Sequence, residues 1–318
     1  MTPCSRALFE GLIDYAGLFP PAELPMEEAF ARFLRHRVSG DGWMLARFVC
    51  PAARLAELEP LLGALDIAPR PFPVAALGRG GATLEAFNAG IDEDAAAIRR
   101  FAARLGEGAL VDAFEVRLPE AGGAAVAVER AWRRLTDDGA RAITPYFEVS
   151  LLGDWRPRLP AAAAAVRDTD RAAGRTHRVG LKIRCGGLDA AAVPEPAAVA
   201  AAIATCRAVG VPLKATQGLH HPFRHRDPIL GVEAHGFLNL FVASILAQVH
   251  DLPVTHLTEV ISETDATTFV FEDGAIGWRD LGADADEVAA ARRQLLTGFG
   301  SCSFTEPRDD LRSLGLID

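Results

Sequence analysis

Short apolar runs and amphipathic segments alternate along most of this chain. The runs have the length and composition of β-strands, and each is followed by a segment whose apolar residues recur at helical spacing. Strands that alternate with helices in this way are typically parallel and joined by crossover helices. The predicted strands are 12–18, 44–50, 72–77, 110–118, 142–151, 179–185 and 211–216, and the predicted helices are 26–37, 51–65, 83–105, 125–135, 160–173 and 196–209.

About eight such units favour an α/β fold of the (β/α)8 type, a closed TIM-type barrel, over an open doubly wound sheet. No Gly-x-Gly-x-x-Gly follows the first predicted strand, so the main sign of a dinucleotide-binding sheet is missing. We expect the eighth strand at 297–304 and a closing helix at 306–316. Residues 253–280 contain an Asp-Gly pair flanked by alternating apolar residues, which predicts a β-hairpin insertion before the last strand of one domain spanning 1–318.

Composition narrows the range of partners and compartments. Half of the 318 residues are apolar, and the net charge of −9 argues against nucleic acid or an anionic membrane as a main partner. The first residues lack the pattern of a signal peptide, and the five cysteines show no CxxC spacing, so we expect a cytoplasmic protein with reduced thiols. The apolar segment 237–249 is too short to span a bilayer and predicts a buried helix.

Lysine is used only twice among 33 basic residues, at Lys182 and Lys214. Each lysine ends an apolar run, and glycine follows within a few residues. Arginine supplies charge, but only lysine supplies an amine that can lose its proton and attack a carbonyl. The two positions are therefore candidates for chemistry as well as for charge.

Alternation along the strands places polar side chains on the face opposite the large apolar ones. In a barrel that face is the interior, and the carboxyl ends of the strands form the active site. Asp112 is expected to point outward by the same alternation. Structural ion pairs and phosphate-binding lysines are the plainer explanation for such charges. The inward-facing residues are Glu115, Arg117, Tyr146, Glu148, Lys182, Arg184, Lys214 and Thr216.

A histidine-rich loop follows the seventh predicted strand and holds His220, His221 and His225. Histidine suits proton transfer near neutral pH, which makes His220 a catalytic candidate and His221 a substrate-binding one. The spacing matches no strong metal motif, although a mixed site of these three histidines with Glu148 stays open as an alternative.

The last predicted strand carries Gly300-Ser301-Cys302-Ser303, where Ser301 and Ser303 are candidate anion ligands at the start of the closing helix. A simple tight turn explains the glycines equally well. Neither Cys302 nor Cys185 has a base visible in the sequence, and an inert thiol is the commoner state.

The two lysine motifs resemble those of class I aldolase barrels of the deoxyribose-phosphate aldolase type. That family carries Val-Lys-Thr-Ser-Thr-Gly on strand six and Val-Lys-Ala-Ser-Gly-Gly on strand seven, where this chain has Leu-Lys182-Ile-Arg-Cys-Gly and Leu-Lys214-Ala-Thr-Gln-Gly. Gly300-Ser301-Cys302-Ser303 is similar to its Gly-Thr-Ser-Ser phosphate loop. The resemblance implies Lys182 as the Schiff-base nucleophile and Lys214 as a neighbouring cation. Ile183-Arg184 and the histidine-rich loop depart from the family pattern.

We therefore expect a lyase of aldolase type that acts on a small anionic carbonyl compound through Lys182. Glu115, Glu148 or His220 would move the proton, Arg117 or Arg184 would hold the anion, and no cofactor is required. A metal-dependent hydrolase, isomerase or lyase is the alternative, with a divalent metal on the histidine loop. A third possibility is a non-catalytic barrel that acts as a binding or assembly module through helix 237–249. A homo-oligomer is possible in each case.

Overall fold

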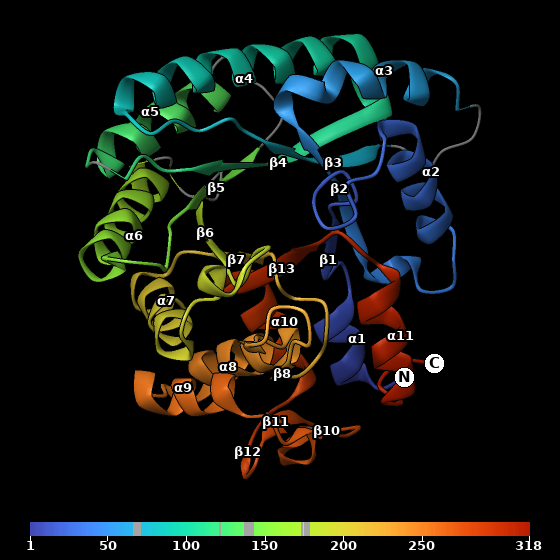
Figure 1. Cartoon of the computed structure of the whole chain (residues 1–318), viewed down its shortest axis with the longest axis vertical. Helices are drawn as coiled ribbons and strands as arrows, with labels where there is room; N and C mark the ends of the chain where they lie inside the picture. The colour runs from blue at the N-terminus through green and yellow to red at the C-terminus, as the bar shows by residue number, and fades with distance from the viewer. Residues whose placement is uncertain (66–70, 121, 137–142, 173, 175–178) are drawn as a thin grey trace.

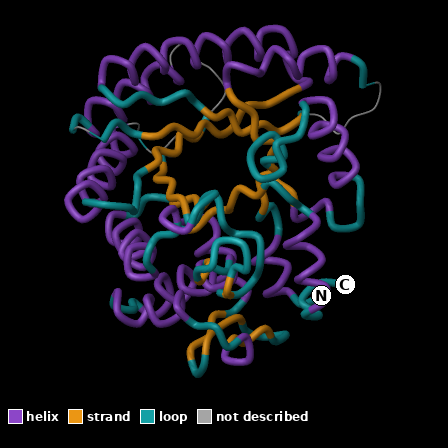
Figure 2. Tube along the Cα trace, viewed as in Figure 1, coloured by secondary structure: helices purple, strands orange, loops and turns teal. Residues whose placement is uncertain are grey.

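The computed structural model describes residues 1–318 except 66–70, 121, 137–142, 173 and 175–178. Parallel strands form a closed barrel in the spatial order β1-β13-β7-β6-β5-β4-β3-β2, and helices surround it (Figures 1 and 2). The predicted (β/α)8 barrel is therefore confirmed. The barrel strands are β1 (Ile13–Tyr15), β2 (Leu45–Pro51), β3 (Phe72–Leu77), β4 (Ala109–Arg117), β5 (Thr144–Glu148), β6 (Gly180–Arg184), β7 (Leu213–Thr216) and β13 (Leu296–Ser301).

The helices that the sequence pattern predicts are present, most of them within a few residues of the predicted ends. Two predicted segments touch residues outside the described part of the chain, namely the start of the strand at Ala142 and the helix end at Ala173. The α-helices are α1 (Pro3–Phe9), α2 (Met26–Arg37), α3 (Leu55–Gly63), α4 (Leu84–Leu105), α5 (Ala124–Thr136), α6 (Trp155–Ala172), α7 (Pro196–Val209), α8 (Phe237–His250), α9 (Val254–Ser262), α10 (Ala285–Gln294) and α11 (Thr305–Ser313).

The eighth strand, β13, lies where it was expected, and α11 closes the ring. The predicted hairpin before it is also present, as β10 (Phe269–Phe271) and β11 (Ile276–Trp278), and it is extended by a third strand, β12 (Leu281–Ala283) (Figure 1). The segment between α8 and this sheet forms α9. A two-stranded ribbon of β8 (His225–Arg226) and β9 (Glu233–Ala234) was not predicted, and it lies in the histidine-rich loop.

Helices α1 and α10 are absent from the prediction, and both carry a start signal that the sequence shows. Asp284 and Glu287 form a capping box at α10, in which each side chain accepts from the other residue's backbone N–H. Thr2 caps α1, with proline at the first helical position. Both helices are short, so their apolar periodicity alone is weak.

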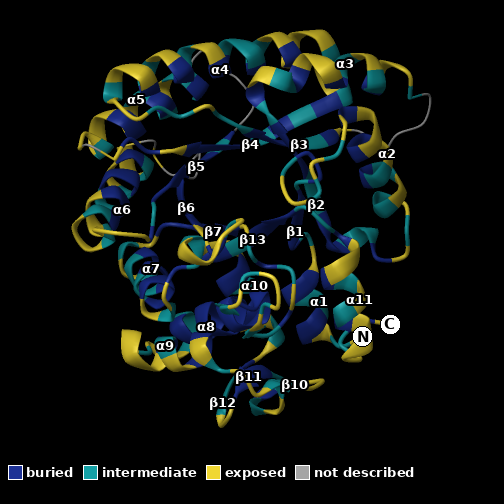
Figure 3. Ribbon diagram, viewed as in Figure 1, coloured by how far each residue is buried: buried dark blue, intermediate teal, exposed yellow. Residues whose placement is uncertain are grey.

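The main core lies between the strands and the surrounding helices, and Figure 3 shows the strands buried and the outer helix faces exposed. Helix α8 is buried along Phe237–Ala247, so it offers no surface for assembly, and that part of the binding-module alternative is wrong. The stretch 190–209 is long and apolar enough to cross a membrane by length and composition. Its helix α7 packs on α6, α8 and α9 as one of the barrel's crossover helices.

Candidate active site

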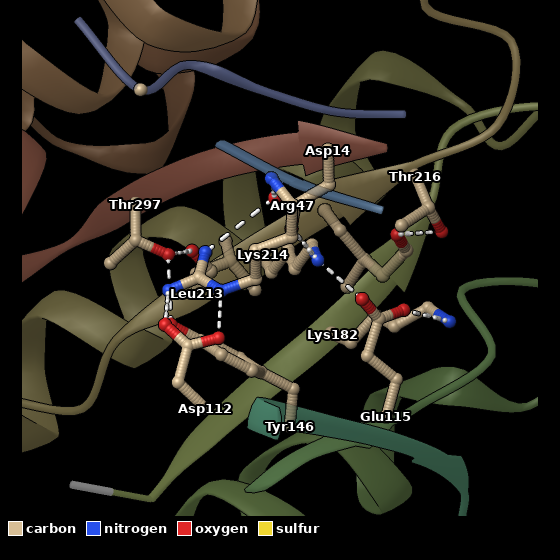
Figure 4. Close-up of polar contacts among 12 residues, drawn as sticks. Asp14, Arg47, Asp112, Glu115, Tyr146, Lys182, Leu213, Lys214, Thr216 and Thr297 are labelled. Carbon is tan, nitrogen blue, oxygen red and sulfur yellow. Dashed lines mark hydrogen bonds and ion pairs between the residues drawn. The ribbon is translucent and has the colours of Figure 1, made fainter. Parts of the chain in front are cut away.

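Four neighbouring strands, β4 to β7, each bring one charged side chain into the barrel. Glu148 on β5 is in register with Lys182 on β6, and Lys182 is in register with Lys214 on β7. Glu115 reaches both lysines from β4. Because these residues share the inward face of adjacent parallel strands, their side chains converge near the barrel axis (Figure 4).

Lys182 lies between two carboxylates. Its Nζ is 2.8 Å from Glu115 Oε2 and 3.0 Å from Glu148 Oε2. Glu148 is held in turn by Arg184, whose Nε is 2.7 Å from Glu148 Oε1. The Lys182 amine therefore has two potential proton acceptors within direct reach.

Lys214 contacts the other oxygen of Glu115 and also Asp14, from β1. The two lysine amines therefore bind opposite oxygens of one carboxylate. This places them far closer together than a Debye length of about 10 Å, so the charge of each affects the other. Figure 4 shows Lys214 with Asp14 on one side and Glu115 on the other.

Burial and charge act against each other in this cluster. Burial alone would raise the pKa of Glu115, but the ammonium groups of Lys182 and Lys214 hold it at about 2. Burial would lower the pKa of Lys214, but Asp14 and Glu115 raise it above its ordinary value. Lys214 therefore stays protonated, as a fixed cation should. Burial would likewise raise the pKa of Glu148, which Lys182 and Arg184 keep below its usual range.

Stability should follow these pKa directions with pH. Because the folded-state pKa of Glu115 is depressed, Glu115 contributes to the free energy of unfolding above its unfolded pKa of about 4.5. This contribution is lost as the pH falls toward about 2. Because the folded-state pKa of Lys214 is raised, Lys214 contributes to the free energy of unfolding below its unfolded pKa of about 10.5. This contribution is lost as the pH rises from there through the folded-state pKa. We expect this cluster to contribute equally to the midpoint of urea unfolding between about pH 5 and pH 10. Its contribution should fall at more acidic and at more alkaline pH. The Glu115→Gln variant should show a shallower acid-side fall, because Glu148 and other carboxylates still contribute to it. An unchanged acid limb would contradict the assignment.

The charged cluster continues toward the amino-terminal end of the barrel through Arg47 on β2. Its backbone N–H donates to Asp14 Oδ1 at 3.0 Å, and its guanidinium makes a two-bond pair with Asp112 at 2.7 and 2.9 Å. Asp112 was predicted to point outward, which is wrong. A register irregularity between β3 and β4 pairs Val74 with Val111 and Ala75 with Ala113, so Asp112 is the extra residue and the alternation shifts there.

A cavity of about 190 Å³ opens above this cluster at the carboxyl ends of the strands. Among the charged residues of the cluster, Glu115, Lys182 and Arg184 line it. Thr216, His220 and Ser301 line it as well, as the sequence predicted for a common site, and so does Cys302. Lys214 is not part of the lining, because it lies beneath Glu115.

Other predicted substrate ligands lie away from this cavity. Tyr146 faces the amino-terminal end, where its hydroxyl is 3.0 Å from Thr297 Oγ1 and a separate cavity is lined by Arg47 and Asp112. Arg117 is half exposed and pairs with Glu120. Ser303 accepts a hydrogen bond from the backbone of Glu306 at the start of α11. These three are predicted ligands without a place at the cavity.

The histidines of the loop each have a local partner. His220 Nδ1 is 3.1 Å from Glu306, His221 Nδ1 is 2.7 Å from Asp310, and His225 Nδ1 is 3.0 Å from its neighbour's carbonyl at Phe223. Within the described residues, no group of three or more His, Cys, Asp and Glu is placed to hold a metal ion. The alternative metal site of these histidines with Glu148 therefore has no supporting geometry, since Glu148 is engaged by Lys182 and Arg184.

The thiols fit the expectation of inert cysteines. Cys185 is buried, and burial raises its pKa. Burial also raises the pKa of Cys302, which lines the cavity. All five cysteines are free.

Two members of the cluster were weakly signalled or missed. The sequence signals Asp14 only weakly, because a three-residue strand shows too little alternation to orient its side chain. Its neighbour Tyr15 packs outward against Phe33 and Phe48. Arg47 had a usable signal, since it is the single charged residue in an otherwise apolar predicted strand.

Comparison with known proteins gives a distant match in fold. No protein-family model matches the chain, and no curated protein matches it. Among solved structures, the chain is similar to the deoxyribose phosphate aldolase from Aeropyrum pernix, described as a unique tetrameric structure, at 14% sequence identity. The match covers 98% of each chain with a TM-score of 0.48.

Proposed function

We propose that this protein is a lyase of the class I aldolase type, which forms a Schiff base with a small anionic carbonyl compound through Lys182. The observation that carries the proposal is the position of the Lys182 amine. It lines the cavity at the carboxyl ends of the strands and lies between Glu115 and Glu148. A lysine kept only for structure would not need two acidic partners at the floor of a cavity.

The chemistry begins with the loss of one proton from the Lys182 ammonium to Glu148 or to solvent in the cavity. The free amine then adds to the carbonyl carbon of the substrate, and the resulting carbinolamine loses water to give an iminium. In the cleavage direction, a base removes the proton of the hydroxyl on the β-carbon, two carbons from the iminium carbon. The C–C bond breaks, its electron pair moves toward the iminium to form an enamine, and an aldehyde leaves. Protonation of the enamine and hydrolysis then release the second product and restore the amine.

Lys214 supports this chemistry from below the cavity. It is held between Asp14 and Glu115, and its pKa is raised, so it remains a cation while Lys182 changes its charge. A fixed positive charge behind Glu115 keeps that carboxylate ionised, so that it balances the charge of the cluster while Lys182 changes its own. The arrangement therefore differs from simple repulsion between two ammonium groups, because Glu115 stands between them.

Arg184 is the cavity residue best suited to the anionic group of the substrate. Its side chain is 47% exposed, and its Nε is occupied by Glu148. Planar guanidinium groups bind carboxylates and phosphates through paired N–H donors. A substrate anion at Arg184 would draw charge away from Glu148 and make that carboxylate a better acceptor for the Lys182 proton.

Reduction with borohydride tests the proposal on the whole protein. Incubation with a panel of small oxo acids and aldehydes followed by reduction should raise the intact mass by one covalently bound ligand, because borohydride converts the iminium to a stable amine. Chelator-treated protein should be labelled equally well. Failure to label with any carbonyl compound, together with activity that a chelator abolishes, would overturn the Schiff base in favour of metal-dependent chemistry. Ligand binding with neither outcome would favour the binding module.

A further inference from the structure

The cavity above Lys182 is divided into two halves of opposite character. Its charged and hydrogen-bonding side chains all come from β4, β6, β7, β13 and the loops after them. The opposite half comes from β1, β2, β3 and their loops, which are adjacent in the barrel. We call this half the apolar wall, and it consists of Ala16, Phe19, Pro20, Pro21, Val49 and Leu77.

The loop residues of the apolar wall, Ala16 and Phe19 to Pro21, also offer no free backbone N–H to a ligand. The Ala16 N–H donates to Ser301 O at 2.6 Å, and the Phe19 N–H donates to Ala16 O at 3.0 Å. Pro20 and Pro21 have no N–H to offer. A hydroxyl group placed against this surface would therefore give up its hydrogen bonds to water without a donor to replace them.

The polar half provides what the reaction itself requires. Lys182 offers the amine, Glu115 a carboxylate, and Arg184 a cation, and His220 lies on the same side. One carbonyl, one acid group and one reacting hydroxyl can thus be satisfied together on this half. Thr216 and Ser301 also line this half and can pair with oxygens of the acid group, so the part of a substrate that extends to the opposite half lies along the apolar wall.

We infer that the substrate is an oxo acid whose remaining substituent is a hydrocarbon group, alkyl or aryl, rather than a polyhydroxylated sugar phosphate. The inference rests on the proposed function, since Lys182 fixes where the carbonyl lies. The hydrocarbon group packs on Phe19, Val49 and Leu77, while the acid group pairs with Arg184. Such a substrate differs from a sugar phosphate in carrying no hydroxyl beyond the reacting one.

Borohydride trapping with matched ligands tests this substrate class. The panel contains an alkyl oxo acid, an aryl oxo acid, an oxo acid of the same chain length as the alkyl one that carries hydroxyls beyond the reacting position, and a phosphorylated hydroxyaldehyde. Apolar pockets reject an added hydroxyl by up to about 10²-fold. We expect the alkyl and aryl acids to label at concentrations about 10- to 100-fold lower than the two hydroxylated compounds.

Two variants locate the preference on the wall. Val49→Thr adds a hydroxyl with almost no change in shape. Leu77→Gln adds a polar amide from the next strand, and it serves if the first variant folds poorly. Each should reduce the preference for the alkyl acid by about tenfold, because the new polar group can pair with the ligand hydroxyl. Val38→Thr and Leu152→Gln are matched controls at exposed positions, and both should leave the preference unchanged.

Calorimetry with carboxylic acids that lack the oxo group tests the substrate class separately from the Schiff base. Equal or stronger labelling by the hydroxylated compounds would overturn the substrate class and leave the Schiff base standing. Absence of labelling, with tighter binding of an alkyl acid than of its hydroxylated counterpart, would overturn the Schiff base and uphold the apolar specificity. Absence of labelling with no such difference in binding would overturn both.

Discussion

The Lys182→Met variant should lose catalysis almost completely, by about 10⁴- to 10⁶-fold in kcat/KM, once a substrate has been found by trapping. Removal of a covalent nucleophile costs this much because the remaining groups of a site can bind and polarise a substrate but cannot form the intermediate. Methionine keeps much of the side-chain volume, so the variant isolates the amine from the space it fills. Steady-state kinetics and intact mass after borohydride reduction are the two readouts.

The Lys182→Arg variant is the matched control for charge. Arginine keeps the cation between Glu115 and Glu148 but is no nucleophile near neutral pH. It should therefore be as inactive as the methionine variant while it retains more of the wild-type stability. Activity above about one tenth of wild type in Lys182→Arg would mean that Lys182 serves as a charge and that the nucleophile lies elsewhere.

The Glu115→Gln variant should lose about 3 kcal/mol or more of the free energy of unfolding. Glu115 is 2% exposed and is the carboxylate that both lysine amines contact. Its removal leaves Lys214 to share Asp14 with Arg47. Lys182 likewise shares Glu148 with Arg184, so one positive charge of the cluster is no longer compensated. Breaking a buried ion pair by removing one partner typically costs about 3–5 kcal/mol. Urea denaturation at pH 7 measures the loss.

The same substitution at an exposed site provides the comparison. Glu120 pairs with Arg117 at the surface, and both side chains are at least half exposed. Glu120→Gln should change the free energy of unfolding by less than about 1 kcal/mol, as exposed ion pairs usually do. If Glu115→Gln were no more destabilising than Glu120→Gln, the buried charges would not be coupled as the contacts indicate.

Much of the barrel could be predicted from the sequence because its strands and helices differ strongly in period. The apolar run at Phe72–Leu77 is a strand with those bounds, and the helical spacing at Met26–Arg37 is a helix with those bounds. Short elements were harder to predict from the sequence. The three-residue strand β1 and the helices α1 and α10 hold too few apolar positions for a period to be seen.

The candidate site was predicted as far as simple alternation reaches. Glu115, Glu148, Lys182 and Lys214 meet inside the barrel because each lies on a regular stretch of strand. Asp112 was misplaced because an irregularity in the strand pairing shifts the alternation by one residue.

Distance along the strand was a second source of error. Tyr146 faces inward as predicted, but it lies one layer nearer the amino-terminal end than Glu148 and does not reach the cavity. Arg117 lies beyond Glu115, where the strand ends and its side chain is exposed. Alternation assigns the face of a strand but not the depth at which a side chain meets the barrel axis.

The most direct test of the account is the location of the reduced adduct on the chain. Wild-type protein labelled with an oxo acid and borohydride is digested, and the modified peptide is sequenced by mass spectrometry. Because the chain has only two lysines, the result separates them cleanly. We predict the added mass on Lys182, which lines the cavity. An adduct on Lys214, which lies beneath Glu115 between two carboxylates, would contradict the assignment of Lys182 as the nucleophile.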